Sequence, residues 1–164
     1  MRTLLLVVFV CLASACAGSA ATLEIPSQYQ DFASAMDFAT PGDTLLLDSG
    51  TYSGPGFSNL QLNLPGELTI TSTHGEARTV VDLQGTDFLL PSNPENDSIP
   101  PEINLIGLSF INGYTVFNIE SPAVLTATNC LFSENTMAVL AVGPEALAAL
   151  QWCSLVDNEY AVVL

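Results

Sequence analysis

The second half of the chain contains a repeat of 22 to 23 residues, and this period limits the folds open to the sequence more than any other feature. The repeat is carried by three segments, which begin at Ile103, Leu125 and Ala148. Similar residues recur 23 positions apart in the last two segments: Cys130 and Cys153, Phe132 and Leu155, Asn135 and Asn158. A fixed period of this size is typical of solenoids and propeller-like arrays.

The alternation inside each repeat predicts its secondary structure. Apolar and polar residues alternate along Leu125–Thr128, and Asn, Gly and Ser bound such runs, as in strands joined by tight turns. A repeat of this length holds two or three short strands, whereas a four-stranded propeller blade needs about 40 residues. The sequence therefore predicts an all-β fold, a right-handed parallel β-helix solenoid. Many short strands are also compatible with a β-sandwich, which stays open as the alternative.

Equivalent residues of a stacked coil form columns, because each coil lies about 4.8 Å above the one before. A one-residue gap in the alignment sets Asn112 opposite Asn135, with Asn158 in the following repeat. We interpret these three residues as an asparagine ladder at a corner, where amides bond to one another and Asn tolerates the left-handed conformation. The alternative is a row of amides that binds sugars.

Cys130 and Cys153 fall in one column, one coil apart. Their expected Cα separation of about 4.8 Å lies within the range for disulfides, but nearly parallel Cα–Cβ vectors disfavour the bridge dihedral. Two buried free thiols, which pack as small hydrophobic groups, are the other interpretation. The sequence leaves this choice open.

The N-terminus has the pattern of a secretory signal peptide. Arg2 is followed by the apolar run Leu4–Leu12 and by small residues up to Ala20. We therefore expect residues 1–20 to be a signal peptide, residues 21–164 to form the β-helix domain, and the protein to be secreted or at the cell surface. The alternative is a bacterial lipoprotein anchored through Cys16. No later segment has the 18 consecutive apolar residues of a transmembrane helix.

The charge balance excludes some partners. The chain has 17 Asp and Glu against 2 Lys and Arg, so its net charge is −15 and its only basic residues are Arg2 and Arg78. Nucleic-acid binding needs several cations on one face, so we expect no nucleic-acid partner.

The first half is expected to begin the coil. Apolar residues from Tyr29 to Ala39 have helical spacing, which predicts a short helix that caps the first coil, with Ser27 as N-cap and Pro41-Gly42 after its end. Strands are expected at 22–25, 43–52, 60–64, 67–72, 79–83. The Pro-rich segment 91–102 is expected to be a loop, and it contains the only N-glycosylation sequon, at Asn96.

Four motifs in this half resemble the N-terminal region of the pectin-lyase-like, right-handed β-helix superfamily. They are Pro41-Gly-Asp-Thr44, Gly50-Thr-Tyr52, Leu68-Thr-Ile-Thr-Ser72 and Thr79-Val-Val-Asp82. The later run Gly107–Gly113 resembles the coil motif of the same superfamily. The resemblance covers nearly all of residues 21–164 and implies the fold, but it is a weak guide to activity.

The resemblance implies two catalytic plans, and the sequence has neither. Lyases of the superfamily use an acidic Ca²⁺ cluster with Arg or Lys, whereas hydrolases use closely set carboxylates with His-Gly and Arg-x-Lys elements. Here Arg78 and His74 lie in one turn and no Lys is present, so we expect no catalytic and no cofactor-binding residues. The densest acidic set is the one remaining candidate for a weak Ca²⁺ site: Asp82, Asp87, Glu95, Asp97, Glu102.

The function expected from these patterns is non-catalytic: a secreted β-helix with a structural, adhesive or carbohydrate-contacting role. The alternative is a divergent or truncated polysaccharide lyase or glycoside hydrolase. The segment Tyr160–Leu164 is an apolar strand with no polar cap after it. We therefore expect an uncapped C-terminal coil, which indicates either a fragment or a surface that contacts another chain.

Overall fold

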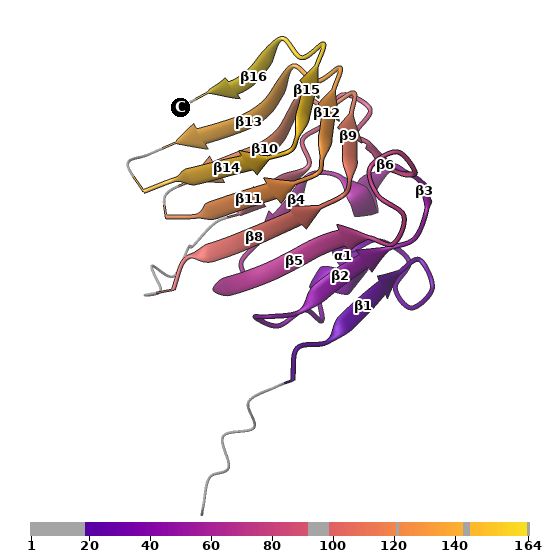
Figure 1. Cartoon of the computed structure of the whole chain (residues 1–164). Coiled ribbons are helices and arrows are strands. Elements are labelled where there is room, and N and C mark those ends of the chain that lie inside the picture. The colour runs from indigo at the N-terminus through magenta and orange to yellow at the C-terminus, as the bar shows by residue number, and fades with distance from the viewer. Residues whose placement is uncertain (1–18, 92–98, 121, 143–144, 164) are drawn as a thin grey trace, which may run out of the picture.

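The computed structural model describes residues 19–91, 99–120, 122–142 and 145–163, and these form a parallel β-solenoid with one short helix (Figure 1). Residues 1–18 of the predicted signal peptide, which include Cys16, lie outside the described residues, as do Glu95, Asn96 and Asp97. Every strand pairing among the described residues is parallel, which confirms the β-helix and excludes the β-sandwich. The described part contains no helix long and apolar enough to span a bilayer.

Three parallel sheets form the walls of the solenoid, and each coil contributes one strand to each sheet after the first coil. The six-stranded sheet, called sheet A, is β1 (Thr22–Ile25), β2 (Thr44–Leu47), β5 (Gly66–Ser72), β8 (Pro101–Ile106), β11 (Val124–Thr128), β14 (Leu147–Gln151). Sheet B is β3 (Gly50–Tyr52), β6 (Thr79–Asp82), β9 (Ser109–Ile111), β12 (Leu131–Ser133), β15 (Ser154–Val156). Sheet C is β4 (Leu60–Leu62), β7 (Leu89–Pro91), β10 (Thr115–Glu120), β13 (Met137–Val142), β16 (Tyr160–Val163).

The strand register places the predicted apolar columns inside the solenoid. Phe110 pairs with Phe132, which pairs with Leu155 in the next coil. The rings of Phe110 and Phe132 stack with centroids 5.7 Å apart and an interplanar angle of 13°. Phe88 extends this aromatic series towards the N-terminus, with its centroid 4.7 Å from that of Phe110. The interior is therefore one continuous core that joins successive coils.

Helix α1 (Phe32–Met36) and the short 3₁₀ helix η1 (Pro55–Phe57) lie at the N-terminal end of the solenoid. Sheets B and C begin only in the second coil, so α1 takes the place of their strands in the first coil. Phe32 is fully buried, and its ring centroid lies 5.4 Å from those of both Phe57 and Phe88. The expected capping helix is present, and one side chain anchors it in the core.

The helix begins later than the sequence predicts. Its N-cap is Asp31, whose Oδ1 accepts a hydrogen bond from Ser34 N at 2.8 Å while Asp31 N donates to Ser34 Oγ at 3.2 Å. The prediction of Ser27 as N-cap is wrong. Residues after β1 form a turn in which Tyr29 N donates to Glu24 O at 2.9 Å, so helical geometry starts only at the capping box.

The last coil, β14–β16, lies at the opposite end from α1 (Figure 1). Its interior-facing Leu150 and Leu155 are only partly buried, whereas Ala127 and Phe132, their partners one coil earlier, are fully buried. Several large apolar side chains of this coil are exposed: Leu147, Trp152, Val156, Tyr160, Val162. The core packing therefore weakens from the fifth coil to the sixth.

Candidate functional site

The corner between sheets A and B has the same unusual backbone conformation in three successive coils. Gly107, Asn129 and Trp152 directly follow paired strand ends, and their φ angles are 66°, 53° and 56°. The tight turn is stabilised by coil-to-coil hydrogen bonds, since Gly107 N donates to Thr128 O and Asn129 N to Gln151 O, both at 3.0 Å. Gly and Asn are common in this left-handed region, whereas a bulky residue there is an outlier.

An inserted loop covers one end of this corner. Residues 73–78 connect β5 to β6 in the third coil, where residues 107–108 suffice between β8 and β9 in the fourth. Ser72 Oγ accepts a hydrogen bond from Gly75 N at 2.6 Å, and Ser109 Oγ donates to Glu76 O at 2.7 Å. A Cβ on Gly107 would lie 3.3 Å from the Cα of Gly75. The loop therefore packs directly over Gly107 and is tied to the solenoid wall.

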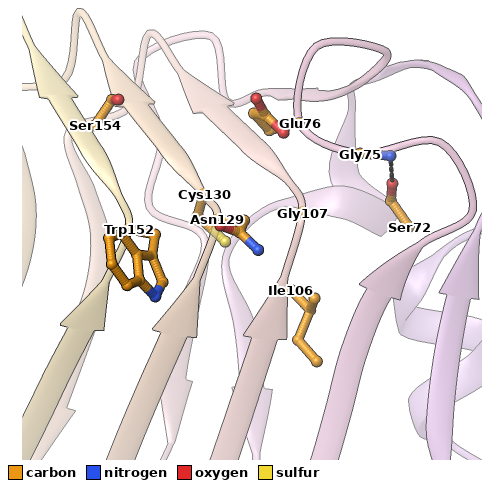
Figure 2. Close-up of a pocket in the computed structure, with 9 residues that line it drawn as sticks. All are labelled: Ser72, Gly75, Glu76, Ile106, Gly107, Asn129, Cys130, Trp152 and Ser154. Atoms are coloured by element: carbon orange, nitrogen blue, oxygen red, sulfur yellow. Dashed lines mark hydrogen bonds between the residues drawn. The ribbon is translucent and has the colours of Figure 1, made fainter.

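The loop and the corner enclose a groove of about 330 Å³, called the corner groove (Figure 2). Trp152 forms one side and its side chain is 86% exposed, while Glu76 lines the groove from the loop. Asn129 lies between the corner positions of Gly107 and Trp152. The lining residues are Ser72, Gly75, Glu76, Ile106, Gly107, Asn129, Cys130, Trp152, Ser154. A flat indole face beside carboxylate, amide and hydroxyl groups can stack on a ligand and hydrogen-bond to it.

The structure brings together two of the three predicted ladder asparagines. Asn135 Nδ2 donates to Asn158 Oδ1 at 3.0 Å and to Phe110 O at 3.1 Å, and Asn135 Oδ1 accepts from Gly113 N at 2.7 Å. Asn158 Nδ2 donates in turn to Phe132 O at 2.9 Å. Neither Asn135 nor Asn158 has a positive φ, so their role at the corner is hydrogen bonding alone.

Asn112 lies one position earlier in its coil than the gapped alignment places it. Ile111 pairs with Ser133 without a gap, so Asn112 is equivalent to Glu134, and both have positive φ angles. The Nδ2 of Asn112 donates to Asp82 Oδ1 at 3.1 Å rather than to Asn135. Asn112 is therefore a left-handed corner residue, and Gly113 occupies the ladder position of its coil.

Cys130 and Cys153 stack in register, and both are free cysteines in the structure. Cys130 is buried, and burial raises the pKa of its thiol to about 11. Cys153 in the last coil is partly buried, with its Sγ 3.4 Å from Ala127 O.

His74 makes the one ion pair found among the described residues. Its Nδ1 lies 3.3 Å from Asp48 Oδ1, and Thr73 Oγ1 also contacts both groups. Hydrogen bonds from Ser49 N and Thr73 Oγ1, together with the charge of protonated His74, lower the pKa of the exposed Asp48. Thr73 and Asp48 both meet the same ring nitrogen, so this cluster lacks the relay geometry of a nucleophile, a base and its orienting acid.

Two acidic residues of the predicted Ca²⁺ set, Asp82 and Asp87, accept hydrogen bonds from other parts of the solenoid. Asp82 Oδ1 accepts from Gln84 N and Asn112 Nδ2, and Asp87 Oδ1 accepts from Thr115 N at 2.9 Å. Across the described ranges, no three His, Cys, Asp or Glu side chains converge on a metal position. Arg78 supplies a backbone contact, since its O accepts from Gly50 N at 2.8 Å.

Sequence reasoning missed Trp152 and Glu76. The signal for Trp152 was present in the repeat, because Gly107, Asn129 and Trp152 lie 22 and 23 positions apart and only the last is bulky. Glu76 had no such signal, since its loop interrupts the period. Comparisons of the chain with protein-family models, curated proteins and solved structures find no match.

Proposed function

We propose that this chain is a secreted or cell-surface β-helix protein that contacts carbohydrate through the corner groove and performs no reaction there. The secretory pattern of residues 1–20 supports the location, and the four N-terminal motifs support kinship with the pectin-lyase-like superfamily.

One observation carries the proposed binding role: the indole of Trp152 is 86% exposed on a left-handed corner. A large aromatic side chain at such a position strains the backbone and leaves apolar surface in water. Because the indole is exposed, it adds no core packing that would offset these unfavourable terms. A sugar ring offers the matching surfaces, an apolar face of C–H groups and a rim of hydroxyls. The indole would stack on the first, and Asn129 and Ser154 would hydrogen-bond to the second.

Binding is tested by affinity electrophoresis and pull-down on a panel of neutral, amino and acidic polysaccharides. We expect Trp152→Ala to abolish retention. Tyr160→Ala is the matched control, because Tyr160 is 51% exposed in the same coil but does not line the groove. Equal retention of the two variants, or no retention of the unmodified protein, would contradict the proposal.

The same panel tests the enzymatic alternative. The protein is incubated with pectin, alginate and neutral polysaccharides in the presence of Ca²⁺, and unsaturated and reducing ends are measured. Release of unsaturated or reducing ends above the background would contradict the non-catalytic role and identify the protein as a lyase or hydrolase.

A further inference from the structure

We propose that the corner groove selects saccharides that carry a protonated amine, with the sugar ring on Trp152 and the ammonium group at the carboxylate of Glu76. This inference rests on the proposed function and narrows its ligand class. It follows from the charge placed in the groove rather than from the groove's shape alone.

Glu76 is the charged member of the groove lining. Its main chain is held by the hydrogen bond from Ser109 Oγ to Glu76 O, and the neighbouring Gly75 N is held by Ser72 Oγ. In the part of the chain that the structure describes, the one ion pair joins His74 and Asp48, so Glu76 has no ion-pair partner there, and Arg78 of the same loop does not line the groove. The groove therefore presents a negative charge on an anchored loop, and no cationic residue is among its lining residues.

The opposite side of the groove also favours a cation. The face of an indole carries negative electrostatic potential and attracts ammonium groups, and Trp is the strongest of the aromatic side chains in this respect. Trp152 and Glu76 line the same groove from separate elements, the end of β14 and the inserted loop. A ligand that places a cationic ring between them gains from both contacts.

The remaining groups and the whole-molecule charge agree with this ligand class. Asn129 and Ser154 offer hydrogen bonds to sugar hydroxyls. With 17 acidic and 2 basic residues, the protein repels acidic polysaccharides and attracts cationic ones at low ionic strength. The combination favours a polymer of amino sugars over a polymer of uronic acids and over a neutral glucan.

The test compares oligomers of glucosamine with N-acetylated oligomers of the same length, since the two differ in charge but share the ring. Affinities are measured by calorimetry at pH 5.5, where the free amine is protonated, in low and in high salt. We expect the deacetylated oligomer to bind roughly tenfold more tightly in low salt, and the difference to shrink in high salt.

Variants assign the effect to the groove. We expect Glu76→Gln to lower the affinity for the deacetylated oligomer about five- to tenfold and to leave the affinity for the N-acetylated oligomer unchanged, because only the charge contact is removed. Trp152→Ala should weaken both. Glu134→Gln is the control for net charge, since Glu134 is exposed and does not line the groove.

Three results would overturn the inference, and they differ from failure of the proposed function. The first is equal affinity for the two oligomers, and the second is an equal effect of Glu76→Gln and Glu134→Gln. The third is that an arginine-rich peptide binds more tightly than the deacetylated oligomer and that this binding depends on Trp152 and Glu76. In the first two cases the proposed function stands if Trp152→Ala still weakens saccharide binding; if no saccharide binds at all, the proposed function fails as well.

Discussion

At the scale of single residues, identical amino acids have different roles according to the corner they occupy. Asn112 and Asn129 supply left-handed backbone, whereas Asn135 and Asn158 supply side-chain hydrogen bonds between coils. Asn135 is 2% exposed and satisfies a donor and an acceptor of the previous coil. Buried polar groups that lose such partners are costly, so the ladder is a point at which stability is sensitive to substitution.

Asn135→Ala should lower the free energy of unfolding by about 2–4 kcal/mol, because it leaves Gly113 N and Phe110 O without their partner in the interior. Asn112→Gly is the control: it removes the bond to Asp82 but keeps the left-handed backbone, and its effect should stay within about 0.5 kcal/mol. Urea denaturation followed by circular dichroism measures both. Equal losses would show that the interior amide is not the source of the stability.

The two cysteines should differ in reactivity. Burial raises the pKa of Cys130 to about 11, so little thiolate forms at pH 8, whereas Cys153 is partly exposed. In a chain that starts at residue 21, we expect iodoacetamide to modify Cys153 first and Cys130 only on unfolding, as read by peptide mass spectrometry. Because the pKa of Cys130 is higher in the folded state, its contribution to stability is complete below about pH 9 and is lost as the pH rises towards 11. Equal labelling rates would contradict this, and two unreactive thiols in denatured, non-reduced protein would reveal a disulfide.

At the scale of elements, the first coil ends the solenoid with a helix instead of two strands. Helix α1 has five residues and would be marginal alone, so its stability comes from the capping box and from packing. Phe32 connects it to the core through Phe57 and Phe88. The helix thereby covers the end of sheets B and C with a short amphipathic segment.

Phe32→Ala should lower the free energy of unfolding by about 3–5 kcal/mol, because it removes a fully buried ring that packs against Phe57 and Phe88. Phe38→Ala is the matched control, since Phe38 is 67% exposed just after the helix, and its cost should be below about 1 kcal/mol. Thermal and urea unfolding measure the difference. Similar midpoints for the two variants would show that α1 is not a structural cap.

At the scale of the whole molecule, stability is distributed along a column of coils that contact only their neighbours. The aromatic series Phe32, Phe88, Phe110 and Phe132 runs through the interior with centroid distances of 4.7–5.7 Å. In such solenoids the free energy is approximately a sum over coils and their interfaces. The sixth coil, with its partly exposed Leu155, is accordingly the weakest described part of the column.

Phe132→Asp should abolish cooperative folding, because a carboxylate would lie between the buried Phe110 of the previous coil and Leu155 of the next coil. We expect the free energy of unfolding to fall by more than about 4 kcal/mol. Val156→Asp adds the same charge at an exposed position one coil later and should leave the unfolding midpoint almost unchanged. Near-ultraviolet circular dichroism and urea titration measure both, and an unchanged midpoint for Phe132→Asp would contradict the stacked columns.

Much of the fold was predictable because in-register parallel stacking repeats its requirements at a constant interval. The period identified the coil, and the Phe110–Phe132–Leu155 column is confirmed without a shift. The helix was predicted in the right region but too early, since apolar spacing does not reveal where the capping box closes. The alignment of Asn112 with Asn135 was wrong by one residue, because it matched identical amino acids instead of keeping the strand register. In that register Gly113, which has no side chain, occupies the ladder position.

The candidate site depended on the tertiary structure. The repeat and the composition together determined an acidic, stacked β-coil with an apolar interior, because those properties follow from residue types at a fixed spacing. They did not determine that the loop after Ser72 folds back over Gly107, or that this leaves Glu76 and Trp152 lining one groove. These placements arise from contacts between neighbouring coils whose residues lie about one coil apart in the sequence, such as Ser109 Oγ with Glu76 O, and only the packed solenoid brings those atoms together.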